Sequence, residues 1–252
     1  MEKLRVSIIT VSYNSSATIA DTIRSVESQT YPNIEHIIID GASTDGTVDI
    51  IKHYGIKISK FISEPDHGIY DAMNKGLKLS SGDITGILNS DDLYIDNSVI
   101  EKVVEQFERT MCDALYGDLY YVQKENTDVI VRKWHSKQFV SGSFRKGWHP
   151  PHPTFFVKND VYSKYGYFDL QFKLAADFEL MLRFLENHKI KQSYLPRPLI
   201  KMRLGGATNK NLQNIIRQNI ECYDAFKKNS IQVSYFYPVI RLFPKVLQYI
   251  KR

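Results

Sequence analysis

Short apolar runs alternate with amphipathic stretches through the first hundred residues. The apolar runs predict four buried strands, at Leu4–Val11, Ile34–Ile39, Ile58–Ile62 and Ile84–Leu88. Apolar side chains at helical spacing follow each run and predict helices over Ala17–Ser28, Thr47–Tyr54, Ile69–Leu79 and Ser98–Glu108. This alternation is typical of βαβ units. It therefore predicts an α/β fold with a mainly parallel sheet that carries helices on both faces.

The second half of the chain has a less regular pattern. It predicts strands at Tyr116–Tyr121 and Val129–Trp134, a loop rich in Gly, Pro and His at Ser141–Pro153, and helices over Asp177–Asn187 and Leu212–Phe226. A length of 252 residues suits one sizeable α/β domain with an appended segment. We expect a domain at 1–210, with halves at 1–95 and 96–210, and a helical C-terminal tail at 211–252.

Polar clusters follow all four predicted strands of the first half. They are Ser12-Tyr13-Asn14, Asp40-Gly41-Ala42-Ser43, Ser63-Glu64-Pro65-Asp66 and Asn89-Ser90-Asp91-Asp92. The carboxyl ends of parallel strands meet at one edge of a sheet, and ligands bind there. The recurrence of such clusters is a stronger sign of a binding site than any one of them.

The adjacent carboxylates of Asp91 and Asp92 repel each other and call for a compensating cation. Mg²⁺ and Mn²⁺ accept carboxylate and phosphate oxygens together, so this pair could hold a metal that neutralises a diphosphate. The alternative is a solvated turn that caps the helix near Ser98. The position of the pair after the fourth strand, in line with Asp40 and the Glu64–Gly68 loop, favours the metal site.

The segment from Asp40 to Thr47 is predicted to be a loop that contacts a nucleotide. Asp40 ends a strand and could accept from a base N–H or a ribose hydroxyl, while the helix start near Thr47 offers N–H donors. The loop is neither GxGxxG nor a Walker A sequence. Alternatively, Asp45 caps the helix and the glycines only permit turns. Asp71, Asn74 and Lys75 share one helical face that could line a nucleotide pocket or be solvated.

Composition narrows the class of protein only a little. Apolar residues make up 43% and charged residues 24%, as in ordinary globular domains. No apolar run reaches the roughly 20 residues that span a bilayer, and we expect a cytoplasmic protein. Cys112 and Cys222 are predicted to be reduced, partly buried thiols. The formal charge of +5 would suit nucleic acid, an anionic membrane or a phosphate-bearing substrate.

Three segments together resemble a known family. The segments SYNSSATIADTIRSVESQTYPNIEHIIIDGASTDGT, SEPDHGIYDAMNKG and LNSDD, in this order and spacing, resemble the inverting family 2 glycosyltransferases of the GT-A fold. The bacterial branch that builds exopolysaccharide, colanic acid and O-antigen units is the most similar. The resemblance is specific to about residue 95 and looser to about 208. It implies a nucleotide-sugar donor, with a UDP-sugar expected, a Mn²⁺ or Mg²⁺ ion, and a carboxylate base that activates an acceptor hydroxyl.

The resemblance also assigns donor-side residues, which makes 1–95 the nucleotide-binding half. Asp92 is preferred for direct metal contact, and Asp91 for the donor sugar or as a second metal ligand. Asn89 stands where many members carry aspartate. The other residues expected at the donor are Thr10, Ser12, Asn14, Asp40, Ser43, Asp66, Gly68, Asn74, Lys75 and Arg203. Arg203 opens the segment Arg203–Thr208, which resembles the mobile loop that covers the donor.

The acceptor half, 96–210, is expected to supply the base. Ala176-Asp177-Phe178-Glu179 matches the family's Glu-Asp motif, with alanine in place of the first acid. Asp177 keeps the motif register and is the expected catalytic base, with Glu179 as the alternative. The loop from His149 to Phe156 resembles one from which a histidine faces the acceptor, and His152 is the expected acceptor-side residue.

The basic, aromatic segment 235–252 has the composition of an interfacial helix. We expect it to rest on the inner face of the membrane, near a glycan or lipid-diphosphate-linked acceptor; the alternative is a helix packed on the domain. A nucleotidyltransferase is the nearest rival enzyme, but Ser12–Ala17 lacks its Gly-rich basic loop. A non-catalytic sugar- or RNA-binding module is the other rival. We expect no nucleic-acid partner, because the aromatic residues form no recognisable stacking platform.

Overall fold

The computed structural model describes residues 3–205, 212–238 and 241. Within these residues, nine strands form one sheet in the order β3-β2-β1-β4-β8-β6-β9-β5, with β7 paired to β6 outside this path. The strands are β1 (Val6–Ser12), β2 (Ile34–Asp40), β3 (Lys60–Ser63), β4 (Ile84–Ile87), β5 (Leu93–Tyr94), β6 (Ala114–Val122), β7 (Ile130–Trp134), β8 (Phe156–Lys158) and β9 (Gln192–Arg203).

The first four strands pair in parallel, as the alternating pattern predicts. In the register of β1 and β2, Val6 lies opposite Ile34 and Ser12 opposite Asp40. All seven residues of β1 are buried, which is expected of a strand covered on both faces. Because β1, β2 and β3 end at the same level, the polar residues after them are brought to one edge.

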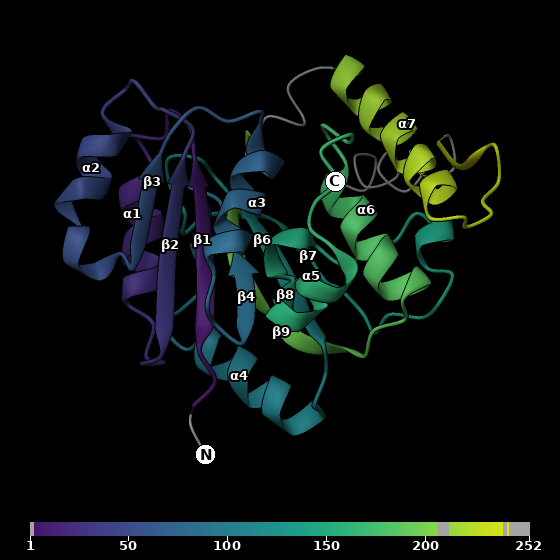
Figure 1. Cartoon of the computed structure of the whole chain (residues 1–252), viewed down its shortest axis with the longest axis horizontal. Helices are drawn as coiled ribbons and strands as arrows, with labels where there is room; N and C mark the ends of the chain where they lie inside the picture. Colours follow the sequence, from purple (N-terminus) through teal and green to yellow (C-terminus); the bar gives the residue numbers. More distant parts are fainter. Residues whose placement is uncertain (1–2, 206–211, 239–240, 242–252) are drawn as a thin grey trace.

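Helices cover both faces of this parallel part. They are α1 (Ile19–Glu27), α2 (Thr47–His53), α3 (Ile69–Leu79) and α4 (Val99–Thr110). Ile9 and Ile37 pack with α3 on one face, whereas Ile8 packs with α4 on the other. Figure 1 shows α3 in front of the strands and α1 behind them. The predicted mainly parallel sheet with helices on both faces is confirmed.

The second half contains strands that the sequence pattern does not reveal. The long strand β9 runs parallel to β6 and carries Pro196 and Pro198, which cannot donate to a ladder. The register of β6 and β9 shifts on both sides of Asp118, so apolar positions lose their alternation there. The short strand β8 pairs antiparallel with both β4 and β6, and thereby joins the two halves of the sheet.

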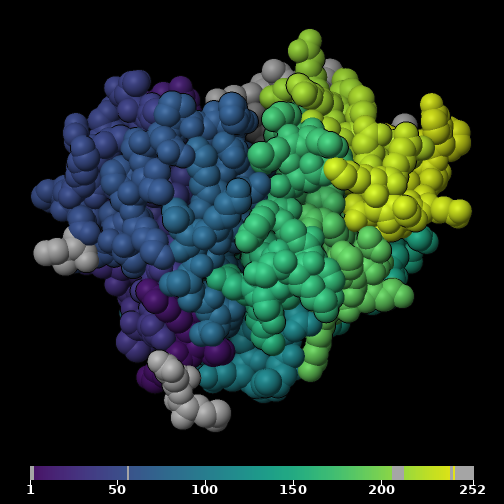
Figure 2. Space-filling view, viewed as in Figure 1, coloured from purple at the N-terminus to yellow at the C-terminus, as the bar shows by residue number. Residues whose placement is uncertain are grey.

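The remaining helices pack on the face of the sheet that carries α3. They are α5 (Asn159–Tyr165), α6 (Ala176–Leu182), which continues as one π-helical stretch at Arg183–Asn187, and α7 (Leu212–Lys228). Cys222, Ala225 and Phe226 of α7 are fully buried in the same core as Phe178 of α6. Figure 2 shows the first hundred residues on one side of the molecule, with the later residues and α7 on the other.

Two short 3-10 turns, at Phe144–Lys146 and His152–Thr154, interrupt the predicted loop at 141–153. Both cysteines are buried, and neither is part of a disulfide bond among the described residues. Among the described helices, none is long and apolar enough to cross a membrane.

Candidate active site

The loops after β1 and β2 are joined by hydrogen bonds at the carboxyl edge of the sheet. The backbone N–H of Asn14 donates to Ser43 Oγ over 2.8 Å, and the Asn14 amide oxygen accepts from Thr44 N over 2.9 Å. Ser15 N donates to Thr47 Oγ1 over 2.8 Å. The two loops therefore form one continuous polar surface, on which Tyr13 is 67% exposed.

Asp40 lies beneath this surface and is fully buried. Its Oδ1 accepts from the hydroxyls of Ser12 (2.9 Å) and Ser43 (2.5 Å). Its Oδ2 accepts from the backbone N–H of Ser43 (2.9 Å) and from Ser63 Oγ (2.8 Å). The carboxylate thus holds together the ends of β1, β2 and β3. A contact between Asp40 and a nucleotide would require one of these donors to leave.

The loop after β3 folds over the same edge. A Cβ atom at Gly41 would lie 2.5 Å from Asp66 Oδ2, so only glycine lets the two loops approach this closely. Asp66 Oδ1 accepts from Gly68 N over 2.8 Å, and Gly68 has a φ of 116°. Lys75 pairs with Glu64 (2.7 Å) and donates to Pro65 O (2.9 Å). The predicted residues Asp66, Gly68 and Lys75 are therefore brought together around this loop.

The Asp91–Asp92 pair follows β4 at the same edge. Asp92 is fully buried, and its Oδ2 accepts from Asn89 Nδ2 at 3.2 Å. No partner for Asp92 Oδ1 is found among the described residues, and the same holds for Asn89 Oδ1. The Asp91 side chain is partly exposed. Burial and the neighbouring Asp91 raise the pKa of Asp92 well above its usual range, and burial also raises the pKa of Asp91.

The two acids differ in how far they are buried. Asp92 is the preferred metal ligand from sequence, yet its carboxylate is enclosed and Asp91 is the acid that reaches the surface. The chemistry of the pair still fits a divalent cation, because an enclosed carboxylate oxygen without a partner is costly unless a cation compensates it. The described residues hold no group of three or more His, Cys, Asp and Glu that could bind a metal alone. The pair therefore fits an ion whose remaining ligands come from phosphate oxygens and water.

Arg203, at the end of β9, lies beside this pair. Its guanidinium donates to the backbone oxygen of Asp91 (2.9 Å) and to that of Lys124 (3.1 Å), and it pairs with Asp21 Oδ2 (2.5 Å). It is 6% exposed. Arg203 thus fixes the Asp91 backbone in this structure. Gly206, Ala207 and Thr208 of the expected covering loop lie outside the described residues.

Two residues expected at the donor lie in the interior. Thr10 is fully buried within β1, and its hydroxyl is 3.0 Å from His36 Nε2. The Asn74 side chain donates to Phe168 O and accepts from Phe168 N, each over 2.9 Å. The expected direct donor contacts do not fit these positions, because both polar groups are enclosed and already paired. Asn74 instead ties α3 to the second half of the chain.

Asp177 lies in the first turn of α6 and faces the donor-side helix α3. Its Oδ1 accepts from the Tyr70 hydroxyl over 2.9 Å. The Tyr70 ring stacks on Phe168, with centroids 5.5 Å apart, and His152 meets the same Phe168 ring edge-on at 5.5 Å. Burial lowers the pKa of His152 although the Asp177 charge opposes this shift, so the imidazole is neutral at neutral pH. The predicted residues Asp177 and His152 are thus brought together.

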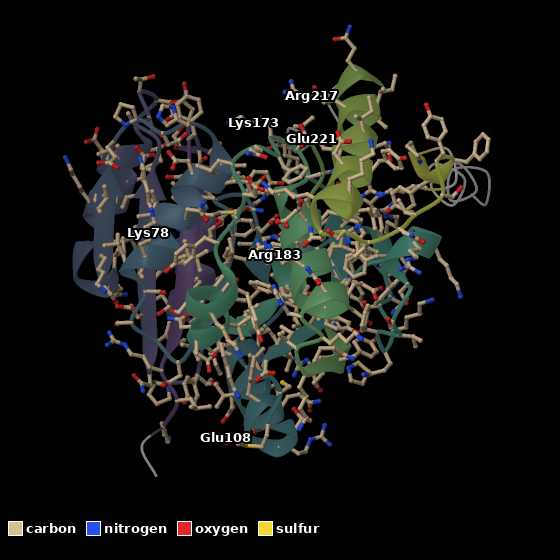
Figure 3. All side chains as sticks on the ribbon, turned by 45° about the vertical axis from the view of Figure 1, so that its right-hand side comes forward. Lys78, Glu108, Lys173, Arg183, Arg217 and Glu221 are labelled. Carbon is tan, nitrogen blue, oxygen red and sulfur yellow. The ribbon has the colours of Figure 1, made fainter. Side chains whose placement is uncertain are left out.

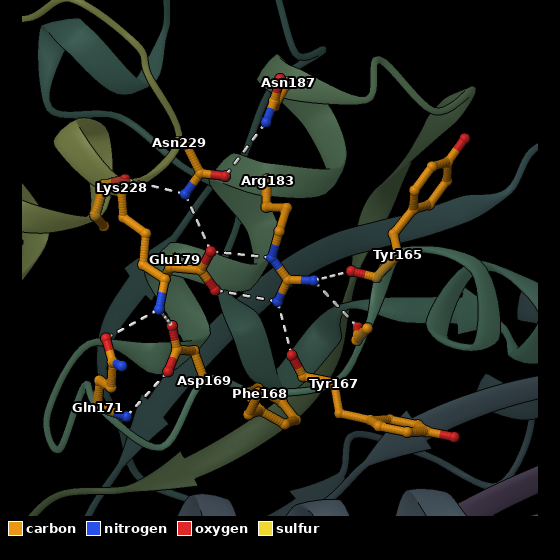
Figure 4. A network of polar contacts seen from close by, with 12 residues as sticks. Tyr165, Tyr167, Phe168, Asp169, Gln171, Glu179, Arg183, Asn187, Lys228 and Asn229 are labelled. Atoms are coloured by element: carbon orange, nitrogen blue, oxygen red, sulfur yellow. Dashed lines mark hydrogen bonds and ion pairs between the residues drawn. The ribbon is translucent and has the colours of Figure 1, made fainter.

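Glu179, the alternative base, serves another purpose. It is 2% exposed and pairs with Arg183 through Nε over 2.9 Å. The Arg183 guanidinium also donates to the backbone oxygens of Tyr165, Gly166 and Tyr167, and Asn229 donates to Glu179 Oε1 (Figure 4). A carboxylate so enclosed by donors cannot accept a proton from an acceptor hydroxyl. Asp177 is therefore the better placed of the two acids.

Helix α7 holds the segment that leads into α6. Glu221 Oε2 accepts from the backbone N–H groups of Leu174 (2.7 Å) and Ala175 (3.0 Å), directly before Asp177. Figure 3 shows Glu221 and Arg217 on α7 beside the loop that carries Lys173. At its C-terminal end, α7 also pairs Lys228 with Asp169. The segment expected as an appended tail thus begins with a helix that braces the candidate base.

Tyr70 is a site residue that the sequence alone does not identify. Tyr70 lies one helical turn before Asn74, so the two share the face of α3 that meets the second half. That spacing could have identified the face, but not the fact that it meets Asp177, which is 107 positions further along the chain.

Comparison with known proteins places the chain in a family. The family described as Glycosyl transferase family 2 matches residues 7–166, which is more than half of the chain. An uncharacterized glycosyltransferase of Mycobacterium tuberculosis is 33% identical over 180 residues, covering 71% of this chain and 68% of its own length. A PGL/p-HBAD biosynthesis glycosyltransferase of the same species is 25% identical over 197 residues, covering 75% and 73%.

Solved structures agree in fold. Residues 1–349 of S. aureus TarS in complex with UDP-GlcNAc match with a TM-score of 0.68 at 18% identity, over 86% of this chain and 66% of that one. The mannosyltransferase PcManGT from Pyrobaculum calidifontis, in complex with GDP-Man and Mn²⁺, matches with a TM-score of 0.64 at 18% identity, over 95% and 69%. At such identities the likeness concerns the fold, which is GT-A. Together with the sheet and its polar edge, these matches show that the chain belongs to glycosyltransferase family 2.

Proposed function

We propose that this enzyme transfers a sugar from a nucleotide-diphosphate donor to an acceptor hydroxyl and inverts the anomeric configuration. A UDP-sugar is the favoured donor, and a glycan or a lipid-linked saccharide of a bacterial surface polysaccharide is the favoured acceptor. The observation that carries the proposal is the hydrogen bond between Tyr70 and Asp177. It brings an acid of the acceptor half against the helix that follows the donor loop, so that both substrates would meet there.

The donor side supplies a surface for the nucleotide. The exposed Tyr13 ring offers a face on which a base can stack. Asn14, Ser43 and Asp66 surround it with hydrogen-bonding groups from three loops. In this proposal Asp40 and Ser12 shape that surface from below. Lys75 keeps the Glu64–Gly68 loop in place, where it would close on the nucleotide.

We assign the metal contact to Asp91, with the enclosed Asp92 as a second ligand or as a charge behind the ion. The Mn²⁺ complex of the fold neighbour PcManGT supports this assignment, as does the unpaired Asp92 oxygen. A bound Mn²⁺ or Mg²⁺ would supply Lewis-acid stabilisation of the departing diphosphate. Arg203 holds the Asp91 backbone, and after rearrangement it could meet phosphate oxygens itself.

Asp177 acts as the base in the proposed displacement. It takes the proton of the acceptor hydroxyl while the acceptor oxygen forms a bond to the anomeric carbon. The bond from that carbon to the diphosphate oxygen breaks on the opposite side, and the nucleoside diphosphate leaves with the electron pair. One attack without a covalent intermediate inverts the configuration. Neutral His152 and Phe168 border the base and limit water around it.

Release of nucleoside diphosphate from a panel of UDP-, GDP- and dTDP-sugars, with Mn²⁺ or Mg²⁺ present, tests the proposal with water as the acceptor. We expect one donor to be hydrolysed with metal and not with EDTA. Asp177→Asn should lower the rate by about 10²-fold or more while binding of the nucleoside diphosphate survives. Release at the wild-type rate in this variant would show that the base is elsewhere.

We also propose that the protein acts in the cytoplasm, in peripheral contact with the membrane through residues 235–252. Tyr235 and Phe236 are 81% and 67% exposed, which supports this proposal, whereas Tyr237 is buried against Phe226. Residues 239–240 and 242–252 lie outside the described part of the chain. Flotation with vesicles that contain anionic lipid tests the contact. Equal partitioning of the full chain and of a Tyr235→Ser/Phe236→Ser variant would refute it.

A further inference from the structure

Tyr70 lies in the nucleotide-binding half of the molecule and forms a hydrogen bond with Asp177, the candidate base in the other half. Its hydroxyl donates to Asp177 Oδ1 over 2.9 Å, and a carboxylate so engaged on one oxygen has its second oxygen left to receive a proton. Burial and the Asp177 charge raise the pKa of Tyr70 well above its usual range. The phenol therefore remains a hydrogen-bond donor throughout the neutral range.

The Tyr70 ring is held in place from two directions. It stacks on Phe168 with an interplanar angle of 28°. The Phe168 backbone is in turn bonded by both ends of the Asn74 amide, one helical turn along α3 from Tyr70. The Arg183 guanidinium donates hydrogen bonds to the carbonyl oxygens of the three residues before Phe168 (Figure 4). A tyrosine fixed in this way can set the orientation of a carboxylate.

Tyr70 also belongs to the donor loop. Helix α3 begins at Ile69, directly after Gly68, and its Asp71 accepts from His67 N over 3.1 Å. Asp66 accepts from Gly68 N at the other side of the same turn. The loop that would close on the nucleotide is thus continuous with the turn that carries the phenol.

We propose that Tyr70 is a positioning residue that orients the Asp177 carboxylate and joins the acceptor base to the donor loop. This inference rests on the proposed function, because it takes Asp177 to be the base. It goes further because it names the residue that orients the Asp177 carboxylate. It also connects this orientation to the loop that would contact the donor. The competing explanation is a buried tyrosine that merely satisfies its hydroxyl on the nearest acceptor.

Tyr70→Phe separates the two explanations, because it keeps the ring stack and removes only the hydroxyl. Tyr31→Phe is the matched control: its hydroxyl donates to Leu4 O over 2.6 Å, at the amino end of the sheet. With water as acceptor and a UDP-sugar as donor, we expect Tyr70→Phe to lower kcat roughly tenfold with an unchanged KM for the donor. Tyr31→Phe should leave both constants unchanged at a similar loss of thermal stability. Equal kcat in wild type and Tyr70→Phe would overturn the proposal.

A double-mutant cycle tests whether Tyr70 acts through Asp177. If it does, adding Tyr70→Phe to Asp177→Asn should lower kcat by less than twofold, because the carboxylate that Tyr70 orients is already absent. A full tenfold loss on that background would show that Tyr70 acts by another route, and would sink the proposal.

A measurement without turnover keeps the inference independent of the proposed activity. The carboxyl ¹³C resonance of Asp177, assigned by its loss in Asp177→Asn, can be compared at one pH in wild type and in Tyr70→Phe. Removing the hydrogen bond from the Tyr70 hydroxyl should move the chemical shift of this resonance. An unmoved resonance contradicts the positioning role even in an active enzyme, whereas a moved resonance with no hydrolysis of any donor contradicts the proposed function alone.

Discussion

Two buried carboxylates at opposite ends of the same sheet differ in the number of hydrogen-bond donors around them. Glu35, near the amino end of β2, is fully buried and accepts from Ser7 Oγ, Ser81 N, Ser81 Oγ and Lys60 Nζ over 2.6–2.8 Å. Asp92, after β4 at the carboxyl end, is equally buried but has one weak partner and one oxygen without any among the described residues. The described residues supply donors to both oxygens of Glu35 and leave one oxygen of Asp92 without a donor.

The difference shows in the two pKa values. Hydrogen bonds from Lys60, Ser7 and Ser81 outweigh desolvation and lower the pKa of Glu35 to about 2. Burial and the Asp91 charge raise that of Asp92 well above its usual range. A group completed by its own protein contributes to stability, whereas one completed by a ligand lowers stability until the ligand arrives. An unpaired oxygen, more than burial, therefore distinguishes Asp92 at the carboxyl end of this sheet from Glu35 at the amino end.

The largest effect should come from removing Asp91, the partly exposed acid beside Asp92. Asp91→Asn should lower metal-dependent release of nucleoside diphosphate by about 10²-fold or more, because the proposed ion loses its accessible ligand. The thermal unfolding temperature without metal should be unchanged or slightly higher, because the repulsion between Asp91 and Asp92 is removed. Wild-type release at saturating Mn²⁺ would contradict the role of Asp91.

Glu35→Gln should have the opposite profile, with stability lost and activity kept. The substitution removes the negative charge that pairs with Lys60. It also places an amide N–H₂ group, which is itself a donor, next to the hydrogen-bond donors that surround Glu35. Because Lys60 and Arg5 are 38% and 45% exposed, screening reduces the loss to about 2 kcal/mol of unfolding free energy. Urea unfolding measures it, with Glu105→Gln, whose exposed side chain pairs with Lys102, as a control expected to lose under about 0.5 kcal/mol. A loss at Glu35 no larger than the control would refute the structural role.

The Glu35 contribution should also depend on pH in a defined direction. Its folded pKa of about 2 lies below the ordinary glutamate value of 4.5, so its stabilisation is fully present above pH 4.5. It is lost as the pH falls from about 4.5 to about 2. Wild type and Glu35→Gln should therefore differ in unfolding free energy at pH 6 and converge at pH 2. A constant difference across this range would show that the carboxylate charge is not what stabilises the fold.

The smallest effect is expected for Asp92→Asn in the absence of metal. Replacing an enclosed, repelled carboxylate by a neutral amide should raise the unfolding free energy by less than about 1 kcal/mol. The protection that Mn²⁺ with UDP gives against thermal unfolding should shrink in the same variant. A loss comparable to that of Glu35→Gln would mean that the two ends of the sheet do not differ as proposed.

Much of the donor edge follows from the sequence alone. Buried strands that are each followed by polar residues place Ser12, Asp40 and Asp91 at one edge because parallel strands end together. The pattern could not distinguish outward from inward side chains at that edge. Thr10, Asn74 and Asp92 were therefore expected at the ligand, whereas their burial depends on neighbours that are distant in sequence.

The amino-acid sequence by itself determined the parallel α/β core, the family and the row of polar loops, because these depend on local periodicity and on motifs within short segments. Only the tertiary structure decided which acids are available. It enclosed Glu179 with Arg183, buried Asp92 while leaving Asp91 partly exposed, and set Tyr70 against Asp177. Glu179 and Arg183 are four residues apart, but Tyr70 and Asp177 are 107 residues apart. No local pattern encodes that pairing.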